Sequence, residues 1–249
     1  MGIWRLERHL IVNADDFGQS HGVNRGIIEV HERGILTSAS LMVRWPAARE
    51  AASYARRNQK LSVGLHFDFA EWTCDRGRWR PLYEVVAQDD HRGVMKEAKR
   101  QLATFRLLLG RDPTHLDSHQ HTHRTRSHRS FFEEMAAALG VPLRSFCRRV
   151  RYVGNFYGQS TNGHALPNLI SACALTRLLR QLQPGFTEIG CHPGYASDLQ
   201  SMYRSERTKE VEVLCDSRVR RAIAEMGIHL CSFHDFNKGY RDGQISYEP

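Results

Sequence analysis

The sequence is poor in the features that mark secreted and membrane proteins. Its six cysteines form no C-x-x-C pair and no closely spaced framework, a usage typical of a reducing compartment. No window approaches the roughly 18 to 20 consecutive apolar residues of a membrane span, and residues 1–10 lack the continuous apolar stretch of a signal peptide. We therefore expect a cytoplasmic protein with no membrane span.

Signatures of nucleotide and nucleic-acid binding are also missing. The chain contains neither a G-x-G-x-x-G turn nor a P-loop. Lysine and arginine number 35 against 27 aspartate and glutamate residues, which gives a formal net charge of +8. The small basic clusters at 144–151 and 218–221 match no zinc-finger or RNA-recognition pattern, so we expect no nucleic-acid partner. The positive field could instead attract an anionic substrate.

The composition is that of a folded globular protein. The 249 residues are 41% hydrophobic, 25% charged and 9% aromatic. A chain of this length buries about 70–75% of its unfolded surface, so its core requires neither disulfides nor a structural metal. Because no repeat, low-complexity tract or linker interrupts the sequence, we expect residues 1–249 to form a single domain.

Short apolar runs alternate with helical patterns along the whole chain. The expected strands are 9–14, 37–43, 61–67, 114–118, 143–146, 187–191 and 228–233; the expected helices are 21–33, 46–57, 94–109, 130–139, 166–182 and two stretches within 206–225. Ser130 and Glu133 resemble a capping box, and 148–163 is assigned only as loop. The β-α-β-α order predicts parallel strands. About seven such strands favour a distorted (β/α) barrel over a doubly wound sheet.

Acidic and imidazole side chains follow the carboxyl ends of these strands. They are Asp15 and Asp16 after the first strand, His66 at the end of the third, Asp117 and His119 at the end of the fourth, His192 after 187–191, and His234 and Asp235 after the last. In a (β/α) barrel, these ends share the face on which active sites lie. We therefore expect these side chains to converge.

A carboxylate and two imidazoles from different strands can hold a metal ion and leave positions open for water and substrate. A second carboxylate and a further histidine could then act as base and acid. Ordinary interpretations remain open for single motifs: Asp15 and Asp16 could cap a turn, and His192 before Pro193 could belong to a rigid turn. The histidines that alternate along 115–123 indicate a functional site, because they lie near one another and solvent-exposed positions usually carry Lys, Glu or Ser instead.

Seven pieces of the sequence match one known family in its own order, nearly from end to end. They are IVNADDFG (11–18), VNRGIIE (23–29), GILTSASLMV (34–43), VGLHF (63–67), PTHLDSHQHTH (113–123), GCHPGY (190–195) and GIHLCSFHDF (227–236). By these motifs, the chain resembles the YdjC-like carbohydrate deacetylases, also called the ChbG/HpnK family. The resemblance implies a distorted (β/α) barrel that binds one divalent metal ion and removes acetyl groups from N-acetylated sugars.

The resemblance also implies roles for particular residues. By motif, Asp16, His66 and His119 would be the metal ligands, Asp15 the general base, and His192, as an imidazolium, the general acid. The set expected to orient these groups or to contact substrate is Asp117, His121, His123, Tyr195, His234 and Asp235. The aromatic residues that could stack on sugar rings are Trp72, Trp79, Tyr83, Phe156, Tyr157 and Tyr195.

The chain departs from the family pattern at several points. The family often has HHHVH where residues 119–123 read HQHTH, so a substrate contact can differ. An Arg-Asp pair often ends the closing strand, whereas His234 and Asp235 stand here, which leaves the general acid open between His192 and His234. The loop 148–163 matches no family motif, and we expect substrate identity to reside there.

Two imidazoles and one carboxylate favour zinc or another late transition ion, although the family is often described with magnesium. The expected partner is an N-acetylated saccharide, and a homodimer is an open option. The alternative activity is a metal-dependent phosphoesterase or another metallohydrolase acting on an anionic small molecule. A non-enzymatic binding module is less consistent with the intact ADD, GLH and HLDSH motifs.

Overall fold

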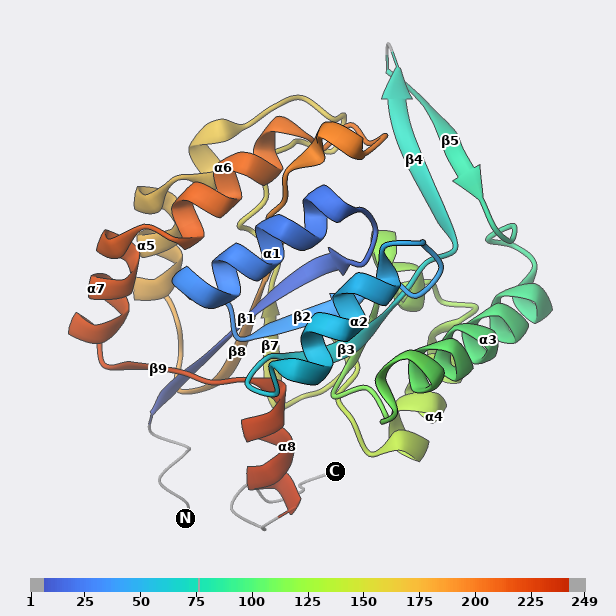
Figure 1. Cartoon of the computed structure of the whole chain (residues 1–249), viewed down its shortest axis with the longest axis horizontal. Helices are drawn as coiled ribbons and strands as arrows, with labels where there is room; N and C mark the ends of the chain where they lie inside the picture. The colour runs from blue at the N-terminus through green and yellow to red at the C-terminus, as the bar shows by residue number, and fades with distance from the viewer. Residues whose placement is uncertain (1–6, 76, 242–249) are drawn as a thin grey trace.

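The fold is built on a sheet of seven strands. The computed structural model describes residues 7–75 and 77–241 (Figure 1). The strands are β1 (Arg8–Phe17), β2 (Ser38–Leu41), β3 (Ser62–Phe67), β6 (Leu116–Ser118), β7 (Val150–Val153), β8 (Gly185–Cys191) and β9 (Ile228–Leu230). Their order is β6-β3-β2-β1-β8-β7, with β9 paired to β1, and every one of these pairings is parallel. The distorted, mainly parallel (β/α) barrel predicted from the sequence is therefore confirmed.

The central strand β1 is buried along nearly its whole length. Nine of its ten residues, from His9 to Phe17, are buried, because β2, β8 and β9 pair with it and helices cover the sheet. Burial on both faces is typical of the strands of a covered parallel sheet. Around it, side chains such as Leu10, Val12 and Phe67 form one large core that needs no disulfide.

The helices lie around the sheet in Figure 1. They are α1 (His21–Arg33), α2 (Ala48–Arg57), α3 (His91–Leu109), α4 (Arg129–Leu139), α5 (Ala172–Arg180), α6 (Ser205–Leu214), α7 (Ser217–Glu225) and α8 (Phe233–Arg241). Amphipathic spacing explains their packing: Val94, Ala98, Phe105 and Leu109 of α3 are buried at intervals of one or two turns. Among the described residues, no helix is long and apolar enough to cross a membrane.

Helix ends follow local chemistry at most of the expected places. Ser20 caps α1 by accepting a hydrogen bond from the backbone N–H of Val23 at 3.1 Å. Gly110 and Gly140 end α3 and α4 in the left-handed conformation that glycine adopts readily. The expected capping box at Ser130 is wrong: α4 begins one residue earlier, at Arg129, and has no side-chain cap.

The stretch after β3, to which the sequence analysis assigns neither helix nor strand, forms a separate antiparallel hairpin. Its strands are β4 (Ala70–Asp75) and β5 (Arg78–Glu84), and the hairpin projects from the body of the molecule (Figure 1). Pro81 fits within β5 because an edge strand has no second partner that needs its missing N–H. A register shift between Glu71 and Trp72 breaks the alternation that identifies strands in a sequence.

Four further assignments differ from the sequence analysis. The segment 148–163, expected as loop, contains β7, whereas the strand expected at 143–146 is reduced to one bridge between Leu143 and Leu116. The last strand ends at Leu230, and Phe233 already begins α8. The helix expected at 166–182 is divided into the 3₁₀ segment η3 (Pro167–Ile170) and α5.

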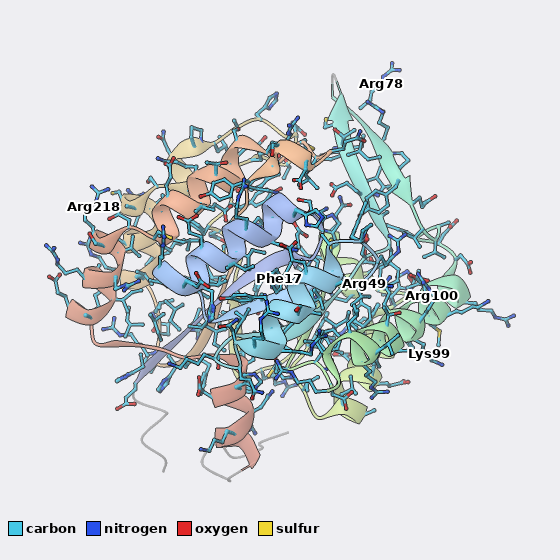
Figure 2. All side chains as sticks on the ribbon, viewed as in Figure 1. Phe17, Arg49, Arg78, Lys99, Arg100 and Arg218 are labelled. Atoms are coloured by element: carbon cyan, nitrogen blue, oxygen red, sulfur yellow. The ribbon has the colours of Figure 1, made fainter. Side chains whose placement is uncertain are left out.

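The cationic side chains spread over several elements rather than one. Figure 2 shows Arg78 at the outer end of the hairpin, Arg218 on α7, and Lys99 and Arg100 on α3, all pointing away from the body, whereas Phe17 lies inside. These four cations therefore lie on three separate elements: the hairpin, α3 and α7.

Candidate metal centre and active site

Three side chains from distant parts of the chain meet at the carboxyl ends of the strands. Asp16 comes from the end of β1, His66 from β3, and His119 from the position directly after β6. Asp16 Oδ1 lies 3.1 Å from Nδ1 of His119 and 3.4 Å from Nε2 of His66. One potential ligand atom of each residue lies within 4.8 Å of the other two, so a single cation could contact all three.

An irregularity in β1 brings two consecutive carboxylates to this centre. The register between β1 and β2 shifts between Ala14 and Phe17, and Asp16 has a φ of 66°, in the left-handed region. In a regular strand, neighbouring side chains point to opposite faces. The bulge, a feature common next to active sites, lets Asp15 and Asp16 both line the cavity.

The donor set fits a divalent metal ion. Asp16 Oδ2 accepts a hydrogen bond from Arg207 Nη2 at 2.6 Å, but Oδ1 is buried and makes no hydrogen bond. A buried carboxylate oxygen without a partner is costly, and this one faces two imidazole nitrogens. One oxygen and two nitrogens from three residues match a catalytic zinc site, which keeps a position open for substrate.

A carboxylate stands behind each imidazole. Asp117 Oδ1 lies 2.7 Å from Nδ1 of His66, and Glu71 Oε2 lies 2.7 Å from Nε2 of His119. If each carboxylate accepts an N–H, the opposite nitrogen of each ring keeps its lone pair for the centre. Asp117 was expected from the sequence to orient an imidazole, and it lies where that role requires. Glu71 was not foreseen.

The electrostatics of the centre favour a cation. Burial alone would lower the pKa of His66, but the carboxylates of Asp117 and Asp15 raise it to about 9. His119 behaves in the same way: burial opposes the charge, and Glu71 and Asp16 raise its pKa well above the ordinary value. Carboxylates that stabilise a proton on these rings would equally stabilise a metal ion between them.

Arg144 holds the second aspartate of the site. Its Nη1 and Nη2 donate to Oδ2 and Oδ1 of Asp15, each at 2.7 Å, and it also contacts Asp117 at 2.8 Å and Glu188 at 2.6 Å. Burial raises the pKa of Asp15, but Arg144 outweighs it, and the net shift is downward. Asp15 is therefore a carboxylate in a fixed orientation. Burial raises the pKa of Glu188 to about 7 despite the same arginine.

His192 lies beside this aspartate. It follows β8 directly, and its Nε2 lies 3.8 Å from Asp15 Oδ2. Its backbone N–H donates to Glu210, which also accepts from the hydroxyl of Tyr203. Burial lowers the pKa of His192 to about 4. The imidazolium expected from the sequence is therefore not the resting form of this histidine at neutral pH.

These residues open into a cavity of about 330 Å³. Its wall contains Trp72 and Trp79 of the hairpin, and Tyr152, Tyr157 and Tyr203. The segment 148–163 therefore borders the centre, where a loop that determines substrate identity would have to lie. Trp79 is 48% exposed, an unusual exposure for so large an apolar ring.

Three aromatic residues considered for sugar stacking lie elsewhere, which corrects that expectation. Phe156 is fully buried in the core. The hydroxyl of Tyr83 donates to Asp68 at 2.7 Å. Tyr195 packs beside α1, where its hydroxyl donates to Glu29 at 2.8 Å. Phe156 and Tyr195 lie in Gly-rich segments that look like exposed turns in the sequence, but both side chains pack against the core.

The histidines after His119 separate. His121 lines the cavity, and its φ of 54° places it in a left-handed turn of the 3₁₀ segment η2 (His119–Arg124). His123 turns away: its Nδ1 lies 2.7 Å from Ser118 Oγ, and its ring packs against Phe132. A substrate contact by His123 is thus wrong, because the left-handed turn breaks the alternation assumed in the sequence analysis.

His234 and Asp235 lie at the other end of the barrel. The strand β9 pairs only with Arg8 to Leu10 at the start of β1, so the chain after it stays far from the carboxyl ends. The two residues line a separate cavity with Leu36 and Lys60, which precede β2 and β3. Asp235 accepts hydrogen bonds from Ser232 where α8 begins. This position does not fit the expected catalytic or substrate role of His234 and Asp235, and of the two candidate acids His192 is the one that lines the centre.

A parallel (β/α) barrel with a carboxylate–imidazole centre at its strand ends defines the class of barrel metallohydrolases. The chain belongs to the family described as YdjC-like protein, whose model matches residues 9–225. It is 33% identical to a chitooligosaccharide deacetylase of Serratia marcescens, over 92% of this chain and all of that protein. It is 32% identical to a carbohydrate deacetylase of Geobacillus stearothermophilus, over 94% and 100%.

Two of the solved structures with a similar fold belong to proteins whose names refer to carbohydrates. One, provisionally named a cellobiose-phosphate cleavage protein, is from Enterococcus faecalis V583 and superimposes with a TM-score of 0.73 at 26% identity, over 92% of this chain and 99% of that one. A family 4 carbohydrate esterase from Streptomyces lividans superimposes with a TM-score of 0.52 at 13% identity, over 90% and 91%. The second likeness concerns the fold alone.

Proposed function

We propose that the protein is a metal-dependent hydrolase that removes the acetyl group from an N-acetylated sugar. The observation that carries this proposal is the meeting of Asp16, His66 and His119 beside a second carboxylate, Asp15, in a cavity with aromatic walls. Membership of the YdjC-like family, with relatives named deacetylases, favours this reaction over phosphate ester hydrolysis.

Asp16, His66 and His119 would hold the ion through the buried Oδ1, Nε2 and Nδ1 atoms that face one another. When bound, the ion would polarise the acetyl carbonyl and acidify the attacking water. Two imidazoles and one carboxylate suit zinc or another late transition ion better than magnesium, which prefers oxygen ligands throughout. Arg207 binds Asp16 Oδ2, whereas Oδ1 makes no hydrogen bond and faces both imidazoles, so Oδ1 would be the ligand atom.

Asp15 would accept the proton of the attacking water. Its two hydrogen bonds to Arg144 hold the carboxylate plane in one orientation and keep the group anionic before the reaction. Each carboxylate oxygen has a further lone pair that can accept a proton. Orientation of this kind counts in catalysis because a base must lie within hydrogen-bond reach of the proton that it removes.

His192 would protonate the amine of the departing sugar. Because burial keeps its ring neutral at rest, it must first gain a proton. Asp15 lies 3.8 Å from Nε2 and is placed to pass on the proton that it has accepted. The pair would therefore work in sequence, and the hydrogen bond from the backbone of His192 to Glu210 would keep the ring at the cavity wall.

The decisive experiment is acetate release from a panel of N-acetylated mono- and oligosaccharides, with and without a chelator. We expect acetate from at least one sugar, loss of the activity with the chelator, and its return with zinc. Phosphate release from phosphorylated sugars is measured in parallel. Phosphate without acetate would replace this proposal with the phosphoesterase alternative.

The free thiols of all six cysteines support a reducing, cytoplasmic location as part of the same proposal. The single-domain organisation and a homodimer stay predictions. A single cooperative unfolding transition would support the first, and sedimentation of the purified protein would test the second.

A further inference from the structure

We propose that Glu71 is a positioning residue that presents His119 to the metal through Nδ1, so that the β4–β5 hairpin becomes part of the metal centre. This inference rests on the proposed function, because it assumes that His119 binds the ion. Among the described residues, Glu71 makes no hydrogen bond or ion pair with Asp16 or His66, so it would act on the ion through His119.

The geometry selects which nitrogen of His119 would carry the proton once a metal ion is bound. Glu71 Oε2 lies 2.7 Å from Nε2, and a carboxylate can only accept there. With a cation bound beside Asp16, the ring would carry its single proton on Nε2, and Nδ1, 3.1 Å from Asp16 Oδ1, would direct its lone pair to the cation. Without a partner on Nε2, either nitrogen could carry the proton, and the ring could turn.

Asp117 and His66 form the matching pair on the other side of the centre. There the carboxylate lies 2.7 Å from Nδ1, and Nε2 faces Asp16. The two imidazoles thus use opposite nitrogens, and each is backed by its own buried carboxylate. Such outer carboxylates orient metal-binding histidines and raise their basicity.

The backbone of the hairpin is shaped for this contact. Glu71 and Trp72 are consecutive, and in a regular strand they would face opposite sides. The register shift between them lets both line the cavity. Without this bulge, only one of the two could reach the centre.

His119 has little other support on this side. It begins η2, where Gln120 and His121 have φ values of 51° and 54°, so no regular helix holds the ring. Glu71 contacts two consecutive residues of this segment, because its Oε1 also accepts from Gln120 Nε2 at 3.3 Å. Glu71 is only 5% exposed, and both of its carboxylate oxygens contact this segment.

The test measures zinc affinity in the absence of any saccharide, by competition with a chromophoric chelator. The variants are Glu71→Ala, which removes the acceptor, and Glu71→Gln, whose amide oxygen can still accept from Nε2. The matched control is Glu84→Gln, an exposed carboxylate on the same hairpin. Thermal unfolding in chelator checks that each variant is folded.

We expect Glu71→Ala to weaken zinc binding by about 10- to 100-fold, the usual effect of losing an outer partner. Glu71→Gln should lose less, and Glu84→Gln should equal the wild type. If the folded Glu71→Ala and Glu71→Gln proteins both bind zinc within threefold of the wild type, the inference is overturned. Should the alanine variant fail to fold, the glutamine variant decides on the same criterion, with a loss of threefold or more expected.

A second readout separates positioning from a purely structural role of Glu71. Nitrogen-15 NMR of the zinc-loaded wild type should show the metal on Nδ1 of His119 and a slowly exchanging proton on Nε2. In Glu71→Ala, that proton should exchange rapidly; a proton as protected as in the wild type would contradict the inference. A wild type that binds no zinc overturns the proposed function as well, whereas unchanged affinity in the variants overturns only the role of Glu71.

Discussion

Asp15 and Arg144 are 129 positions apart in the chain, yet they meet through two parallel hydrogen bonds of 2.7 Å. This bidentate geometry is the strongest form of contact between a carboxylate and a guanidinium group. Both partners are buried, and Arg144 also contacts Asp117 and Glu188. The charge of Arg144 therefore offsets several carboxylates around the proposed base. We infer that this arginine stabilises the fold as well as orienting Asp15.

Replacing this arginine should destabilise the protein. Arg144→Gln would leave buried carboxylates without their cation, and we expect the free energy of unfolding to fall by about 3–5 kcal/mol in urea titrations. Arg151→Gln, on the exposed side of β7, is the matched control and should change stability by less than about 0.5 kcal/mol. A loss below about 1 kcal/mol for Arg144→Gln would mean that the carboxylates relax or take up protons.

Loss of the base should be separable from loss of the metal. Asp15→Asn should keep zinc bound but reduce turnover by about 10²- to 10⁴-fold, the range expected for a general base. His66→Ala and His119→Ala should lose zinc as well as turnover. Zinc content is measured after dialysis, and turnover by acetate release. Normal turnover in Asp15→Asn would remove this residue from the proposed mechanism.

Removal of the metal should stop the reaction without unfolding the chain. The hydrophobic core, which includes Leu10 and Phe67, is large. A core of this size keeps the chain folded without a structural metal ion. Zinc at one hundred times its Kd should add about 2.7 kcal/mol to the free energy of unfolding. Circular dichroism with and without chelator checks this. Unfolding on chelation would show that the ion is structural.

Two buried histidines outside the metal centre should make the protein sensitive to mild acid. Burial lowers the pKa of His115 and of His123 to about 3, whereas histidine in an unfolded chain has a pKa of about 6.5. Above pH 6.5 both states are neutral and stability does not change. As the pH falls below 6.5, only the unfolded state binds these protons, so stability is lost by up to about 1.4 kcal/mol per histidine per pH unit.

The measurement compares the slope of the unfolding free energy between pH 7 and pH 5 in the wild type and in His123→Asn. Asparagine cannot take up the proton, so the slope of the variant should be smaller by the contribution of one histidine. The comparison uses slopes because the substitution also changes stability at pH 7. Equal slopes would show that His123 is protonated in the folded state.

Much of the fold could be predicted from the sequence because local signals agreed with it. The spacing of apolar residues, with Ser20 before and Gly34 after, predicted the helix 21–33, and α1 has those bounds. The strand-end rule brought Asp16, His66 and His119 to one place because parallel strands end on one face. Both results depend on short-range patterns and on one topological rule.

The misses have physical causes that a sequence does not display. In the sequence, Arg144 is one cation of the basic cluster at 144–151, and the strand expected at 143–146 is only a single bridge in the structure. Glu71 reaches the centre only through a bulge, which shifts the side-chain alternation. His234 was placed wrongly because β9 pairs with the beginning of β1 and not with its end. Register and bulges are set by tertiary pairing, which local patterns do not encode.

The hairpin should contribute to sugar binding through Trp79, whose indole is 48% exposed at the cavity wall. Loss of an aromatic stacking contact costs roughly 0.5–1.5 kcal/mol, so Trp79→Ala should raise KM about 2- to 12-fold. It should leave kcat unchanged, because stacking would hold the sugar equally in the ground state and in the transition state. Leu107→Ala, 85% exposed on α3, is the control for loss of an exposed apolar side chain and should change neither constant. A lowered kcat with unchanged KM in Trp79→Ala would show that the hairpin acts on the metal centre and not on the sugar.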